Sequence, residues 1–256
     1  MNHPMLKYLL FIVIGLSGGL TAPLSGDATA DYSDTPIPKP PFPKPYQDYI
    51  VYPQSQSPDH HYGFLYPARS VVFDLPSVSM YLITLKPFGI VSEMPSYEGH
   101  LAISSGGFFV ANWAKDSSAV VIIYGMKWGP DTVYLIPLHE GKVGKIVDLT
   151  EEITKLAEPD FKKSKAEPFN DHFSFIFDDS DHTKADATSD NVIRDDGWTI
   201  NAQNQVIINC TLSSNPKHDT GMASWTGTVK GLWDISQGKF VSVKFTRTFS
   251  GEYKDQ

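Results

Sequence analysis

The residues of this chain that could do chemistry match none of the common catalytic motifs. After residue 30 there is no G-x-S-x-G, the motif that places a nucleophilic serine on a strained turn. His139-Glu140 is not followed by a second histidine at helical spacing, so the zinc-protease pattern is absent. Gly238-Lys239 is followed by Phe240, so no phosphate-binding G-x-x-x-x-G-K-[ST] loop is present. These absences favour a non-catalytic function.

Two clusters contain residue types that bind metal ions. Asp59-His60-His61 combines a carboxylate with imidazoles, which suit zinc. Adjacent side chains in a turn rarely converge on one ion, and no third ligand is identifiable. Calcium prefers several carboxylate oxygens, and the acidic loop offers Asp178, Asp179, Asp181, Asp186 and Asp190. This loop lacks the glycine and terminal glutamate of the twelve-residue calcium loop, so the sequence predicts neither a metal ion nor a cofactor.

Aromatic residues give the best candidate for a binding site. Trp128 precedes Gly129-Pro130-Asp131, which places it in a loop, and an exposed indole can stack on a sugar or anchor a peptide. We therefore expect Trp128 to bind a ligand. The other four tryptophans are expected to fill the spaces between packed sheets: Trp113, Trp198, Trp225 and Trp233.

The first thirty residues are typical of an export signal. A mildly basic start leads into an apolar stretch from Tyr8 to about Leu20, and Ala28-Thr29-Ala30 is an A-x-A cleavage signature. A membrane anchor is the alternative, but the uninterrupted apolar part is shorter than the ~20 residues that a spanning helix needs. The sequence thus predicts cleavage before Asp31 and a periplasmic or extracellular location.

Charge and cysteine content narrow the partners and the fold. The net charge of −8 without basic runs argues against nucleic acids and, after signal cleavage, against membranes as partners. The single cysteine, Cys210, cannot form an internal disulfide, and its apolar flanks predict a buried, inert thiol. Packing alone must stabilise this domain, and its length permits a substantial core.

Two segments follow the signal. Residues 31–46 carry a proline at many alternate positions, which predicts an extended spacer of the polyproline type. Residues 47–256 are expected to form a single β domain with a helical and acidic insertion at about 150–196. In the insertion, Thr150 resembles a helix N-cap before one or two short helices around Pro159, and 172–177 resembles a strand.

The β domain contains three similar units. The central unit spans 113–149 and has three β-rich runs separated by turns. A first unit from Tyr49 to Val91 has the same order, and its Asp59 precedes Asp116 of the central unit by 57 residues. A third unit ends at Phe245, and its turn Gly238-Lys239 matches Gly141-Lys142.

Ser57-Pro58-Asp59 and the segment Trp113 to Ser118 resemble the W-S-P-D-G/S turns of TolB-like and WD40-like β-propeller repeats. Tyr81-Leu82-Ile83 and Tyr134-Leu135-Ile136 resemble the later strands of such repeats. The resemblance covers most of 49–249 and implies a mostly antiparallel all-β fold of partial or irregular propeller-like repeats. It implies no chemistry, because propellers carry many functions.

Two functions of different class remain open from the sequence. The first is an exported non-catalytic module that binds a protein or glycan of the envelope or the extracellular space. The second is a secreted hydrolase of a glycan or ester, for which Asp59 and Asp116 are the first residues to test. Both aspartates are more simply explained as turn-formers that bond their own backbone, which favours the binding module.

Overall fold

The computed structural model describes residues 42–68, 79–95, 108–126, 129–169, 176–178, 197–214 and 225–250. Contacts divide the chain into two units, Met1–Thr35 and Pro36–Gln256, and everything described belongs to the second unit. The expected signal peptide, most of the expected linker and nearly all of the acidic loop lie outside the described residues. Within the described residues, no helix combines the length and the apolar character needed to cross a bilayer.

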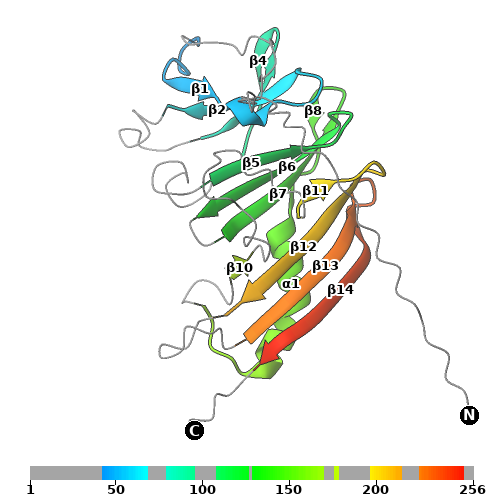
Figure 1. The fold of residues 1–256 in the computed structure, drawn as a ribbon. Coiled ribbons are helices and arrows are strands. Elements are labelled where there is room, and N and C mark those ends of the chain that lie inside the picture. The colour runs from blue at the N-terminus through cyan, green and yellow to red at the C-terminus, as the bar shows by residue number, and fades with distance from the viewer. Residues whose placement is uncertain are drawn as a thin grey trace, which may run out of the picture. The chain divides into compact units, whose positions relative to one another are not determined.

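The strands form three antiparallel sheets (Figure 1). The first sheet has the order β1-β2-β3-β4, with the short 3₁₀ helix η1 (Pro53–Ser55) between its first two strands. Its strands are β1 Tyr49–Val51, β2 Tyr62–Pro67, β3 Tyr81–Leu85 and β4 Phe88–Glu93. Every neighbour along the sheet is also the neighbour along the chain, so this sheet is a meander.

The second sheet repeats this arrangement in the order β5-β6-β7-β8, and β9 also pairs with β7. Its strands are β5 Phe108–Trp113, β6 Ala119–Met126, β7 Gly129–His139, β8 Lys142–Val143 and β9 Val147–Asp148. The third sheet has the order β10-β12-β13-β14, and β11 pairs with β12. Its strands are β10 Ile176–Asp178, β11 Thr199–Ile200, β12 Gln205–Ser213, β13 Trp225–Asp234 and β14 Lys239–Ser250.

The second sheet packs with both faces because β6 is apolar on both sides. Successive side chains of a strand point to opposite faces. Val120 and Ile122 pack in one cluster with residues of the first sheet, such as Phe64. Val121 and Ile123 pack in another cluster with residues of the third sheet. The uninterrupted apolar run in the sequence is therefore the signature of a strand buried between two neighbours.

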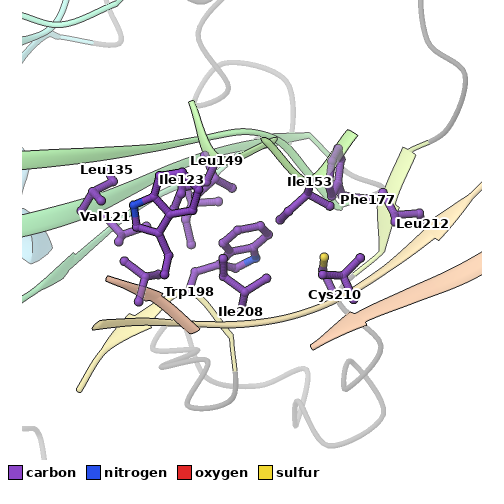
Figure 2. Packing of buried hydrophobic residues seen from close by; sticks show 14 of the residues in the cluster. Val121, Ile123, Leu135, Leu149, Ile153, Phe177, Trp198, Ile208, Cys210 and Leu212 are labelled. Atoms are coloured by element: carbon purple, nitrogen blue, oxygen red, sulfur yellow. The ribbon is translucent and has the colours of Figure 1, made fainter. Parts of the chain in front are cut away.

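The larger cluster joins the second sheet, the third sheet and the single α-helix (Figure 2). This cluster buries three residues of the third sheet region almost completely: Trp198, just before β11, and Ile208 and Cys210 of β12. The predicted burial of the Cys210 thiol is thereby confirmed. The predicted mostly antiparallel β fold is confirmed as well, and within the described residues none of the three sheets closes on itself.

Helix α1 (Leu149–Ser164) is one continuous helix. Its N-cap is Asp148, whose Oδ1 accepts a hydrogen bond of 2.9 Å from the Glu151 N–H, so the predicted N-cap at Thr150 is wrong by two residues. Pro159 lies inside the helix and does not end it. Residues four apart bury one stripe of the helix on both sides of the proline, which keeps the helix on the core: Ile153, Ala157 and Phe161.

Two boundaries differ from those expected. Phe42 and Tyr46 were expected in the spacer, yet both pack on the first sheet because their rings find aromatic partners there. The Phe42 ring stacks on Phe88 at 5.0 Å, and the Tyr46 ring meets Tyr81 edge-on at 5.1 Å. The strand expected over 172–177 is observed as β10, with 171–175 outside the described residues.

Candidate functional site

A polar cavity of about 610 Å³ lies where the second sheet, the start of α1 and the β13–β14 hairpin meet. Ligand sites in proteins commonly have volumes of this order. Strands β7 and β9 line one side, helix α1 contributes its first two turns, and β13 with its following turn contributes the rest. The cavity is therefore built from segments about a hundred residues apart in the sequence, and we take it as the candidate site.

The side chains of β7 reach the cavity because they alternate along the strand. Leu135, Pro137 and His139 are spaced by two residues and all line it. The chain then reverses at Glu140 and Gly141, whose φ values of 51° and 78° are those of a tight hairpin turn. The N–H of Gly144 donates to the Pro137 carbonyl at 2.8 Å, and this bond returns the chain across β7.

The returning segment supplies the next part of the wall. Lys145, Ile146 and Val147 line the cavity, and β9 pairs with β7 through Leu135 opposite Val147. Asp148 is the next residue and caps α1, so the first turns of the helix also line the cavity. One short stretch of sequence thus provides the hairpin, the wall and the helix start.

The β13–β14 turn is fixed by one aspartate. Asp234 Oδ1 accepts hydrogen bonds from the Ser236 hydroxyl at 2.7 Å and from the Gln237 N–H at 2.9 Å. These bonds lower the pKa of Asp234. Gly238 has a φ of 60° and donates its N–H to the Asp234 carbonyl at 2.9 Å. The turn therefore holds Ser236, Gln237 and Gly238 as a defined rim of the cavity.

The acidic side chains of the cavity are engaged within the protein. The Lys155 ammonium group lies 2.8 Å from Glu152 and 2.9 Å from Glu151. Hydrogen bonds to Glu152 and then Glu151 raise the pKa of Lys155, so it stays protonated at all physiological pH values. Asp148 is occupied by capping the helix. The carboxylates consequently offer little uncompensated negative charge to a ligand.

Two donors that line the cavity, His139 and Lys145, are open to a ligand and have no partner among the described residues, and a third donor lies buried in the wall. The indole Nε1 of Trp233 is buried and makes no hydrogen bond, and the residue is 4% exposed. The side chains of His139 and Lys145 are exposed, and neither forms a hydrogen bond or ion pair within the described part of the chain. A buried N–H without a partner is costly. The site is therefore suited to a ligand rich in acceptor oxygens.

The residues singled out in the sequence lie elsewhere. Trp128, the expected ligand-binding residue, is outside the described residues, so this expectation stays a prediction. The expectation of a loop over Gly129-Pro130-Asp131 is wrong, because these residues begin β7, in which Gly129 and Pro130 pair with β6. Asp59 and Asp116 do not line the cavity. Asp59 Oδ1 accepts from the Ser57 hydroxyl at 2.5 Å and from the His61 N–H at 3.0 Å. It therefore forms its own turn, as the simpler explanation had it.

Asp116 plays the same part in the second sheet. Its Oδ1 accepts from the Ser118 hydroxyl at 2.6 Å and from the Ser118 N–H at 3.1 Å. These bonds lower the pKa of Asp116 despite partial burial. For Asp59, burial raises the pKa, but the hydrogen bonds from Ser57, His61 and Ser117 outweigh burial and the pKa is lowered. Both carboxyl groups are thus held in the ionised form.

The remaining tryptophans are packed between the sheets, as predicted. Trp198, Trp225 and Trp233 are buried, and Trp113 is half-buried with its Nε1 donating to the Ser55 carbonyl at 3.0 Å. The His139 and Lys145 side chains were not singled out from the sequence as ligand-binding. No local signal connects them with Trp233, because only the packing of β7 on the third sheet brings these residues to one cavity.

A search for groups of three or more metal-ligating side chains finds none among the described residues. Comparison of the chain with protein-family models, curated proteins and solved structures finds no match. The resemblance to TolB-like and WD40-like repeats therefore stays a prediction.

Proposed function

We propose that this protein is a non-catalytic module that binds a glycan in the cavity between β7, α1 and the β13–β14 turn. The observation that carries the proposal is the pair of exposed, unpartnered donors that line a cavity of about 610 Å³, His139 and Lys145. Sugars present many hydroxyl and ring oxygens, and these accept hydrogen bonds from such donors. One small saccharide unit is compatible with this volume.

The apolar part of the lining supports the same ligand class. Pro137, Ile146 and Val147 supply carbon surface beside the polar groups. A sugar combines C–H faces with polar edges, so a mixed lining suits it better than a purely apolar ligand. Trp233 is too deeply buried to offer its ring face, and its Nε1 is buried as well, so this residue forms part of the wall and donates no hydrogen bond to a sugar.

The alternative, hydrolysis of a glycan or ester, has less support. Glycoside hydrolysis by two carboxyl groups needs one of them protonated as a general acid, which requires a raised pKa. Asp59 and Asp116 have lowered pKa values and bond their own turns. The acids beside the cavity are engaged with Lys155 or the helix N-terminus. These facts favour binding without turnover.

We further propose that the protein is exported and meets its ligand in the envelope or outside the cell. The apolar stretch and the A-x-A signature in residues 1–30 support secretion to the periplasm or the extracellular space. A module there meets the glycans and proteins of the envelope. A glycan is the ligand that the cavity favours, and a protein partner is the second candidate, with Trp128 as its expected anchor.

We also propose that the three sheets are variants of one propeller-like repeat. In support, the fourth residue of each turn before the second strand has a left-handed backbone: His60, Ser117 and Asn204 with φ values of 56°, 60° and 54°. In each turn its N–H donates to the carbonyl three residues earlier, with distances of 2.9, 2.9 and 3.1 Å. Similar turns at corresponding places support a common unit.

The test is a titration of the purified protein with glucose, N-acetylglucosamine and glucuronic acid, followed by calorimetry. Loss of one hydrogen bond between the protein and the ligand weakens binding by up to about tenfold. We therefore expect Lys145→Ala and His139→Ala each to weaken binding of the accepted sugar by about this factor, with Lys142→Ala as a matched surface control. Unchanged affinity in both variants, or binding of none of the three sugars, contradicts the proposal.

A further inference from the structure

Two lysines face each other directly on the outer face of the third sheet. Lys230 of β13 pairs in register with Lys244 of β14, and both are exposed. Neither forms an ion pair within the described residues. Like charges directly opposite on neighbouring strands destabilise a sheet. The pair therefore breaks a local rule without a compensating partner in the described structure.

Within the described strands, the rows next to this pair contain no acid. The other face of β12 is buried in the core through alternate residues such as Ile208 and Cys210, so the intervening residues face outwards. The three rows of this outer face nearest the pair are Ile207, Leu232 and Ser242; Asn209, Lys230 and Lys244; and Thr211, Thr228 and Thr246. The next row holds Gln205, Asp234 and Lys239, in which the Asp234 carboxylate bonds its own turn. We call the three rows nearest the pair the Lys–Thr face. It is positively charged on a chain whose net charge is −8.

We propose that the Lys–Thr face is a docking surface for an anionic glycan. Side chains directly opposite in a sheet have Cβ atoms about 5 Å apart, so one carboxylate or sulfate group can contact both ammonium groups and remove their repulsion. The neighbouring threonine hydroxyls and the Asn209 amide can bond the sugar hydroxyls. Charge complementarity and hydrogen-bonding capacity thus point to the same ligand.

Other occupants of this region use the charges less well. An extended peptide added at the free edge of β14 would lie about 4.8 Å from that strand and about twice as far from β13, out of easy reach of Lys230. Anionic membranes recruit clusters of about four to eight basic residues, more than the two on this face. A glycan lying on the face contacts both lysines at once.

This inference does not rest on the cavity. Trp233 lines the cavity and pairs with Val206, whose side chain is buried in the core, whereas Lys230 lies on the opposite face of the same strand. The two sites can therefore be tested with separate variants. Loss of one function leaves the other intact.

The experiment measures binding of hyaluronan, chondroitin sulfate and uncharged dextran to the purified protein by biolayer interferometry at low salt. We expect binding of the two anionic glycans, weakened about tenfold by Lys230→Gln/Lys244→Gln. The control Lys142→Gln/Lys163→Gln removes the same charge elsewhere and is expected to leave binding unchanged. All proteins compared carry His139→Ala and Lys145→Ala, so that sugar binding in the cavity does not contribute. Thermal melting checks the fold, and the single variant Lys244→Gln replaces the double variant if the latter unfolds.

Each contrary outcome overturns the proposal. Equal weakening by the control pair would mean a general charge effect. Equal binding of dextran would remove the role of the lysines, and failure of both anionic glycans to bind would remove the ligand. Tighter binding of single-stranded DNA or of phosphatidylserine vesicles would assign the face to a different polyanion.

Discussion

The amide N–H of Asp59 lies 3.4 Å from the Oγ of Ser117, which joins the turn before β2 to the turn before β6. The turn before β12 continues the row: hydrogen bonds from Ser118 are the main cause of the lowered pKa of Asp116, and a hydrogen bond from the side chain of Asn204 adds the smallest contribution. Each sheet thus contacts the next through the corresponding turn. This row of turns fixes how far the sheets are offset along one another while apolar side chains fill the space between them.

The Asp116 turn gives the first prediction. Asp116→Ala removes two hydrogen bonds to Ser118, and we expect the free energy of unfolding to fall by about 1 kcal/mol. Lys115→Ala, in the same turn but exposed, should change it by less than about 0.5 kcal/mol. Urea unfolding at neutral pH measures both. An Asp116→Ala protein as stable as the wild type would refute the role given to this turn.

The two turn aspartates also predict a pH dependence. Their pKa values are lowered in the folded state, so the stability that they contribute is complete above their unfolded-state pKa, which is near 3.8. It is lost as the pH falls through the lower folded-state pKa. The double variant Asp59→Asn/Asp116→Asn should therefore lose less stability than the wild type on acidification from about pH 5 to about pH 2. Parallel stability curves over this range would be contrary to the assignment.

The boundary of the domain is testable at Phe42. This residue is 6% exposed and stacks on Phe88, so Phe42→Ala should lower the free energy of unfolding by about 3 kcal/mol. Lys44→Ala, two residues further on and exposed, serves as the control and should be close to neutral. Chemical unfolding compares the two. A neutral Phe42→Ala would return residues 42–46 to the spacer.

Gly227 is required by the close approach of two rings. A Cβ at this position would lie 2.6 Å from the Phe245 ring and 2.9 Å from Trp225, whose rings stack at 6.0 Å. Gly227→Ala should therefore destabilise the protein by about 1–3 kcal/mol through overpacking. Gly238→Ala meets open space and a left-handed φ, so its cost should stay near 1 kcal/mol. Thermal unfolding with a Trp fluorescence readout separates them.

The lysine pair predicts a gain of stability on substitution. Lys230→Thr removes the repulsion from Lys244 and places a β-branched residue in a strand, so the free energy of unfolding should rise by about 0.2–1 kcal/mol. Lys142→Thr, which has no lysine opposite, is the control. The gain should shrink at high salt, because salt screens the repulsion. A loss of stability in Lys230→Thr would mean that the pair is stabilised in the folded protein.

Much of the fold could be predicted from the sequence because its signals are local. The apolar run of β6 predicted a strand, and Asp59 and Asp116 predicted their turns. The predicted start of α1 was wrong because two nearby residues can both cap a helix: Asp148 is the N-cap, and Thr150 lies inside the first turn. The burial of Phe42 was not predicted because its stacking partner, Phe88, is distant in sequence.

The candidate site could not be predicted in the same way. His139 and Lys145 come from one hairpin and Trp233 from another sheet, and no spacing in the sequence relates them. These three side chains share the lack of a hydrogen-bond partner, a property that depends on the folded structure and has no signature in the sequence. Sites assembled from distant segments leave no local pattern, whereas strands and turns do.

The most direct test of the account observes the Trp233 indole N–H by nuclear magnetic resonance during a sugar titration. Trp233 lines the cavity and its Nε1 has no partner, whereas the indole Nε1 of Trp198 is equally unpartnered but lies outside the cavity lining, which makes it an internal control. We predict that the Trp233 resonance shifts with saturation as the accepted sugar is added while that of Trp198 stays in place. A saturating titration in which the Trp233 resonance does not move would contradict the glycan site.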